Sequence, residues 1–174
     1  FFVRYINGIC LAISPNGNAF EIEHEITRPA VKVSELRNIA DLSKNNRRII
    51  FPYIKKNGVY KLISEQDLRR KFPNACSYLL AVREILETRD KGKKQYENWY
   101  AWARTQGMEA PAPKLLTKTF SKFPQFFLDK SDQLFCNGYG VSTKPPTLFE
   151  ASLPIDFLEK VLNSKVMYYY AKLT

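Results

Sequence analysis

The segment from Pro73 to Lys91 most constrains the fold, because it has the pattern of one long amphipathic helix. Pro73 suits the first position of a helix, and Gly92 suits the position just past its end. Between them, apolar residues recur at intervals of three and four and form one stripe, which comprises Ala75, Tyr78, Leu79, Val82, Ile85 and Leu86. We expect this stripe to be core and the helix to pack on a sheet.

Short strand-like runs separated by turn signals supply that sheet. Runs at 2–6 and 9–13 flank Asn7-Gly8, and runs at 47–53 and 59–63 flank a turn that ends in Asn57-Gly58. Asn-Gly between β-branched runs predicts a hairpin. Residues 20–26 and Lys114–Ser121 have strand composition, and 125–129 with 133–137 predict a hairpin across residues 130–132.

Shorter helices complete the pattern. Ser34 is expected to open a helix through Leu42, Ser64 with Asp67 has capping-box spacing, and Pro154 and Ser164 open two helices near the end of the chain. We therefore predict an α+β fold: a mixed or antiparallel sheet of short strands, one long packed helix and a helical C-terminal end. The 174 residues predict a single domain, with sub-lobes 1–72 and 73–174 as the finer division.

Charge is the strongest compositional signal. Lys and Arg total 27 against 17 Asp and Glu, so the net charge is +10 at pH 7. Such a field favours nucleic acid, an anionic membrane surface or an acidic protein as the partner. The alternative is that the charge only keeps the domain soluble.

Several classes of site and location are disfavoured. Cys10, Cys76 and Cys136 are far apart and His24 is the single histidine, so neither a zinc site nor a disulfide framework is expected. Reduced thiols fit a cytoplasmic protein. The sequence has neither a signal peptide nor an apolar run of about 18 residues, so no membrane span is expected. Because the chain begins at Phe1, within a strand-like run, we expect it to be a piece of a larger protein.

The stretch from Asn98 to Val141 carries the candidate site. Flat aromatics, cations and short hydroxyls gather there, as a polyanion with base edges to read would require. Arg104 and Gln106 are candidates for base contacts, because Arg pairs with guanine and Gln with adenine in the major groove. The full expected DNA-binding set is Lys93, Lys94, Trp99, Tyr100, Arg104, Gln106, Lys114, Thr117, Lys118, Thr119, Ser121, Lys122, Asn137 and Tyr139.

Each part of this set also has a structural reading. The tryptophans Trp99 and Trp102 are either a platform for DNA or core residues. Thr117, Thr119 and Ser121 would share one face of a strand, which either follows phosphates or is an ordinary solvated face. The lysines after residue 90 either contact phosphates or complement a helix dipole.

The order of these motifs resembles a known family. The runs that carry the resemblance are 20–23 (FEIE), 49–53 (IIFPY), Tyr78-Leu79, 86–89 (LETR), Trp99-Tyr100, 104–106 (RTQ), 114–121 and 134–139 (LFCNGY). Together they resemble the C-terminal target-recognition (TaqI-like specificity) domain of adenine-N6 DNA methyltransferases, including fused restriction–modification enzymes. The likeness covers most of the chain and is densest between Pro73 and Gly140.

The resemblance implies that this chain clamps duplex DNA and reads its sequence. Catalysis would belong to an upstream domain of the parent protein, which binds S-adenosylmethionine and holds the flipped adenine with an Asn-Pro-Pro-Tyr/Phe motif. Lys144-Pro145-Pro146-Thr147 lacks the Asn and the aromatic of that motif. No catalytic residue, metal or cofactor is therefore expected in this chain, and it is expected to be a monomer with two partners, duplex DNA and the catalytic domain.

Two other functions stay open. A nuclease would need clustered carboxylates to hold a metal, and Asp129, Asp132 and Glu159 lack such a spacing. An RNA-binding or protein-binding basic module is supported by the charge and by aromatics that could be exposed.

Overall fold

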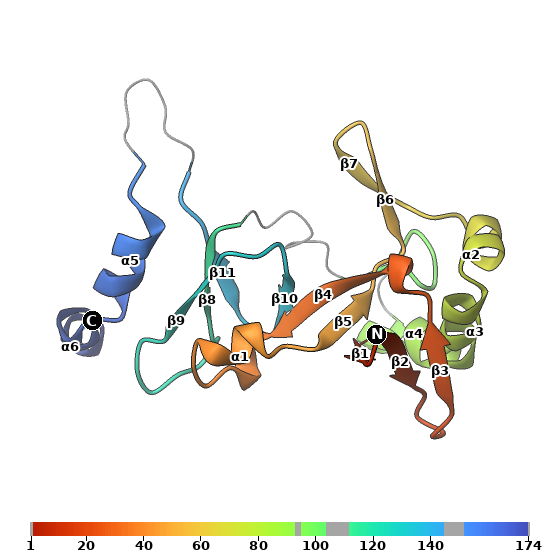
Figure 1. Ribbon diagram of the computed structural model, residues 1–174, viewed down its shortest axis with the longest axis horizontal. Helices are drawn as coiled ribbons and strands as arrows, with labels where there is room; N and C mark the ends of the chain where they lie inside the picture. Colours follow the sequence, from red (N-terminus) through yellow and green to blue (C-terminus); the bar gives the residue numbers. More distant parts are fainter. Residues whose placement is uncertain (1, 93–94, 104–111, 145–151, 174) are drawn as a thin grey trace. The chain divides into compact units, whose positions relative to one another are not determined.

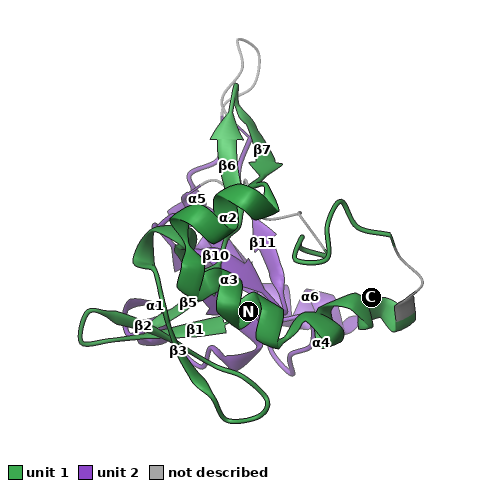
Figure 2. Cartoon of the chain, turned by 90° about the vertical axis from the view of Figure 1, so that its right-hand side faces the viewer, with its two compact units in different colours: residues 1–29, 46–105 green, residues 30–45, 106–174 purple. Residues whose placement is uncertain are grey.

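A computed structural model describes residues 2–92, 95–103, 112–144 and 152–173. The chain divides into two compact units, which Figure 2 colours separately: unit 1 is Phe1–Pro29 with Asn46–Thr105, and unit 2 is Ala30–Asn45 with Gln106–Thr174. Each unit combines segments that are distant in sequence, so the units do not coincide with the expected sub-lobes 1–72 and 73–174. The predicted α+β class is confirmed, with helices beside mixed and antiparallel sheets of short strands.

The sheet of unit 1 is antiparallel. Its order is β4-β5-β1-β2-β3, with β1 at Phe2–Ile6, β2 at Ile9–Ile13, β3 at Ala19–Ile22, β5 at Arg47–Ile50 and the first half of β4, which spans Thr27–Lys32. The predicted β1–β2 hairpin is confirmed, since Asn7 and Gly8 adopt the positive φ values of 50° and 88° that its tight turn requires. The run expected as a strand to residue 26 ends at Ile22, and His24–Ile26 forms a 3-10 turn.

The helices of unit 1 differ from the expected single long helix. Helix α2 (Glu65–Lys71) precedes α3 (Pro73–Ala81) and α4 (Arg83–Glu87), and a 3-10 turn follows at Arg89–Gly92. Val82 separates α3 from α4 with φ −110° and ψ 13°, outside helical geometry. The break redirects the stripe, because Leu86 stays buried whereas Ile85 is 54% exposed. Helix α3 packs its buried residues, including Leu79, against the core beneath β1, β2 and β3.

A two-stranded ribbon extends from unit 1 (Figure 1). Strands β6 (Tyr53–Lys56) and β7 (Val59–Leu62) pair with each other, and neither pairs with any other described strand. The turn expected at Asn57-Gly58 is confirmed, with φ of 50° at Asn57 and 82° at Gly58. The strand before it differs from the expectation: β6 pairs with β7, whereas most of the expected run 47–53 forms β5, which pairs with β1 and β4.

Unit 2 is built around a three-stranded antiparallel sheet. Its order is β11-β8-β9, with β8 at Lys114–Thr117, β9 at Phe126–Asp129 and β11 at Tyr139–Val141. Strand β10 (Leu134–Cys136) pairs in parallel with the second half of β4, from Ala30 to Lys32. The predicted hairpin between 125–129 and 133–137 is therefore wrong: both strands exist, but β9 pairs with β8 instead.

Short helical segments surround this sheet. A 3-10 turn at Val33–Glu35 and helix α1 (Ala40–Ser43) replace the single helix expected from Ser34 to Leu42. Helices α5 (Ile155–Leu162) and α6 (Lys165–Leu173) confirm the helical C-terminal end. The core of unit 2 comprises Val31, Val33, Leu36, Leu42, Leu116 and Phe127, with Phe135 packed against it. Among the described residues, no helix has both the length and the apolar character needed to cross a bilayer.

Candidate nucleic-acid interface

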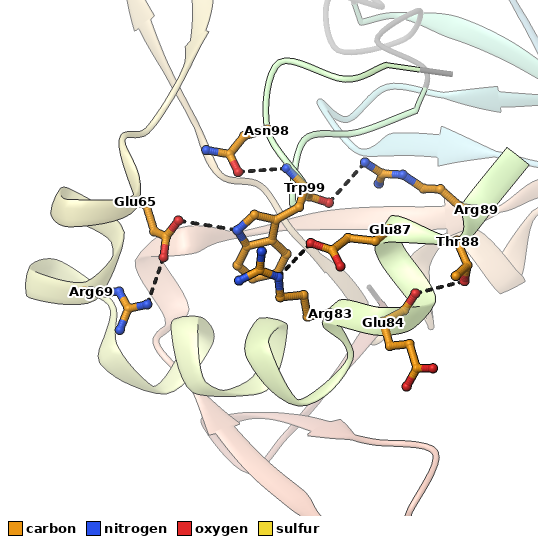
Figure 3. A network of polar contacts seen from close by, with 9 residues as sticks. All are labelled: Glu65, Arg69, Arg83, Glu84, Glu87, Thr88, Arg89, Asn98 and Trp99. Carbon is orange, nitrogen blue, oxygen red and sulfur yellow. Dashed lines mark hydrogen bonds and ion pairs between the residues drawn. The ribbon is translucent and has the colours of Figure 1, made fainter. Parts of the chain in front are cut away.

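Trp99 lies in a polar network that fixes it to the helices of unit 1 (Figure 3). Its indole N–H donates to Glu65 Oε2 at 3.4 Å, and the guanidinium of Arg83 lies 5.1 Å from the ring centroid. Its carbonyl accepts from Arg89 at 3.1 Å. Hydrogen bonds from Arg69 and then from the Trp99 indole lower the pKa of the Glu65 carboxyl. The ring is only half-buried, but its surroundings favour a structural role for Trp99.

The side chains of Tyr100 and Trp102 both donate hydrogen bonds to backbone carbonyls of unit 1. Tyr100 is 1% exposed, and its hydroxyl donates to the Ile63 carbonyl at 2.6 Å. Burial raises the pKa of Tyr100 to about 12. The indole of Trp102 donates to the Ile50 carbonyl at 3.1 Å, and its ring packs edge-on against Phe51. The expected DNA contact at Tyr100 is thus corrected: its side chain closes the core of unit 1.

Lys114 also lies inside the protein. It is 1% exposed, and its ammonium pairs with Asp129 Oδ2 at 3.1 Å and donates to the Ser131 carbonyl at 2.7 Å. The two partners face each other directly across β8 and β9. This burial corrects the expectation that Lys114 meets a phosphate, because desolvation of a charge requires a partner and Asp129 supplies it.

Several expected residues do come together at the end of β8. Tyr139 of β11 pairs directly with Thr117 of β8, so their side chains lie on the same face of the sheet. A Cβ on Gly138 would lie 2.6 Å from the Thr117 carbonyl oxygen and 2.6 Å from the Val33 side chain. Only glycine permits this close approach. Asn137 precedes it with φ of 55°, a conformation that Asn tolerates better than most residues.

The loop after Thr117 contributes the remaining polar groups. β8 ends at Thr117, so Thr119 and Ser121 do not continue a strand face as expected. The Ser121 hydroxyl donates to the Phe123 carbonyl at 2.6 Å, a local contact within the loop. Thr119, Ser121 and Lys122 are exposed and Lys118 is half-buried. We call the set Thr117, Lys118, Thr119, Ser121, Lys122, Asn137 and Tyr139 the β8-end surface.

This surface is basic and partly aromatic. Neither 117–125 nor 136–144, the two segments that form it, contains an Asp or Glu. Tyr139 is 59% exposed, and the loop adds Phe120 at 90% and Phe123 at 58%. Phe120 and Phe123 are not among the residues expected to bind DNA, although apolar residues flanked by lysines were a sequence signal for them. Cations beside exposed aromatic faces are chemically suited to a nucleic acid.

Four expected residues, Lys93, Lys94, Arg104 and Gln106, lie outside the described residues. The described ranges contain no group of three His, Cys, Asp or Glu that could hold a metal ion. His24 is exposed, and Cys10, Cys76 and Cys136 form no disulfide. The candidate site is thus the β8-end surface, which two strand ends and a loop form. Neither a protein-family model nor a curated protein matches this chain.

Proposed function

We propose that this chain is a sequence-specific duplex-DNA recognition module, acting as the target-recognition part of an adenine-N6 DNA methyltransferase. The observation that carries the proposal is the β8-end surface, on which Tyr139, Thr117 and Asn137 meet beside Lys118 and Lys122 without a carboxylate in the same segments. The net charge of +10 supports the same partner.

The surface supplies the two kinds of contact that a DNA reader needs. Lys118 and Lys122 would neutralise phosphates, which gives affinity on any sequence. The amide of Asn137 and the hydroxyls of Thr117 and Thr119 have the donors and acceptors that base edges match. S-adenosylmethionine and the methyl-transfer chemistry belong, in this proposal, to a catalytic domain of the parent protein.

Binding of the full 174-residue chain to a random-sequence DNA duplex across a salt series tests the proposal. Lys118→Gln/Lys122→Gln should weaken binding to all duplexes and reduce the slope of log K against log salt by about two. Arg70→Gln/Lys71→Gln, at the exposed end of α2, removes the same charge elsewhere and is the matched control. Equal effects of both pairs would show that only net charge matters and would contradict a role for this surface.

A second candidate, binding of single-stranded RNA, is favoured by one observation. Phe120, Phe123 and Tyr139 expose flat rings on which unpaired bases could stack. Single-stranded RNA is therefore titrated at the same salt concentrations as the duplex. Tighter binding of RNA than of duplex, reduced by Phe120→Ser, would replace the DNA proposal.

A further inference from the structure

The β6–β7 ribbon of unit 1 has two chemically different faces. Residues paired across the strands lie on the same side, and successive residues alternate between sides. One face consists of the pairs Tyr53–Leu62 and Lys55–Tyr60, and the other of Ile54–Lys61 and Lys56–Val59.

The first face anchors the ribbon to unit 1. The Tyr53 hydroxyl accepts a hydrogen bond from the Trp102 backbone N–H at 2.7 Å, and the two rings pack edge-on at 5.9 Å. The Tyr60 hydroxyl accepts from Arg28 at 3.0 Å, and its ring packs edge-on against Phe51 at 5.3 Å. These contacts hold the base of the ribbon, although a two-stranded hairpin alone would be marginally stable.

The second face is uncovered. Ile54 is 40% exposed and Val59 is 60% exposed, and Lys56 and Lys61 beside them are exposed as well. Neither lysine forms an ion pair with a residue in the described ranges, and residues 51–64 contain no Asp or Glu. The face therefore presents uncompensated positive charge on a two-stranded element that is anchored at its base.

We infer that this free face is a second DNA contact, which enters the major groove of the duplex that the chain binds. The major groove admits a two-stranded β-ribbon. Lys56 and Lys61 would then contact phosphates, and Ile54 and Val59 would lie against thymine methyl groups, which only the major groove presents. The inference rests on the proposed function: the fit of a two-stranded ribbon to the major groove, together with charge complementarity, points to duplex DNA as the occupant.

The test compares three double variants of the full chain on one random-sequence duplex across a salt series. Lys56→Gln/Lys61→Gln alters the ribbon, Lys118→Gln/Lys122→Gln alters the β8-end surface, and Arg70→Gln/Lys71→Gln is the charge-matched control within unit 1. The ribbon variant should bind several-fold more weakly than the control, with the salt slope reduced by about two. Bulky C5 groups on the pyrimidines fill the major groove. Placing them on the duplex should lower the affinity of the unaltered chain more than that of the ribbon variant.

Two results would overturn the inference. If the ribbon variant binds like the control while the β8-end variant loses affinity, the proposed function stands and the ribbon contact is wrong. The other result has the unaltered chain binding phosphatidylserine vesicles but not duplex DNA, and the ribbon variant failing to bind the vesicles. Both proposals would then fail, and the ribbon would be a contact to a lipid surface.

Discussion

At the scale of the residue, burial decides which charges can reach a ligand. Lys114 and Lys118 are four positions apart and have the same side chain, yet Lys114 is 1% exposed and paired with Asp129, whereas Lys118 follows the end of β8. The difference comes from strand register, which places Lys114 directly opposite Asp129. Sequence composition contains no such register, so it could identify a basic segment but could not separate a buried lysine from an accessible one.

We predict that Lys114→Met destabilises the protein strongly. The change leaves the Asp129 carboxylate buried without its counter-charge, which typically costs about 3–5 kcal/mol. Lys114→Met/Asp129→Asn should recover much of that loss, because the amide oxygen can still accept from the Ser131 N–H. Denaturant unfolding of the two variants measures the difference. Equal stability of the single and double variants would mean that the Lys114–Asp129 pair contributes little.

At the scale of the element, turn chemistry separates the predictions that were confirmed from those that were wrong. Asn7-Gly8 and Asn57-Gly58 encode hairpin turns locally, and both hairpins form. Residues 130–132 (Lys-Ser-Asp) contain no Asn-Gly pair. Instead, Asp129 accepts from the Ser131 N–H and hydroxyl, and the chain passes on to a parallel pairing with β4. That pairing joins segments about 100 residues apart, which local sequence cannot specify.

The long helix illustrates the same limit. Its apolar spacing continues through Val82, but the backbone leaves helical geometry there and separates α3 from α4. Tertiary packing overrides a propensity signal of this size. At the candidate site, the sequence indicated Thr117, Asn137 and Tyr139, but only the β8–β11 register shows Tyr139 directly opposite Thr117.

The contact between β11 and β8 depends on Gly138. We predict that Gly138→Ala lowers the free energy of unfolding by about 1–3 kcal/mol, because the new Cβ would overlap the Thr117 carbonyl and Val33. It should also weaken duplex binding, since Asn137 and Tyr139 flank the altered position. Thermal unfolding and the duplex titration measure the two effects. Val166→Ala, at a position of α6 that is 78% exposed, is the control and should change neither quantity.

At the scale of the whole molecule, the side chains that the predictions use divide between the two units. Both tryptophans of the chain, Trp99 and Trp102, belong to unit 1, so tryptophan fluorescence follows that unit alone. The buried Lys114–Asp129 pair belongs to unit 2. The buried Tyr100 belongs to unit 1, and burial also raises the pKa values of Tyr53 and Tyr78 in the same unit.

We predict that alkaline pH destabilises unit 1 through Tyr100. Burial raises its pKa from about 10 to about 12 in the folded chain, so the folded state holds a proton that the unfolded state releases. The stabilising contribution is complete below pH 10 and is lost as pH rises through about 12. Denaturant unfolding followed by tryptophan fluorescence at increasing pH should show this loss. In Tyr100→Phe the loss should be smaller, although stability at neutral pH falls by about 1–3 kcal/mol because the Ile63 carbonyl loses its donor. Parallel pH profiles for the two proteins would contradict the assignment to Tyr100.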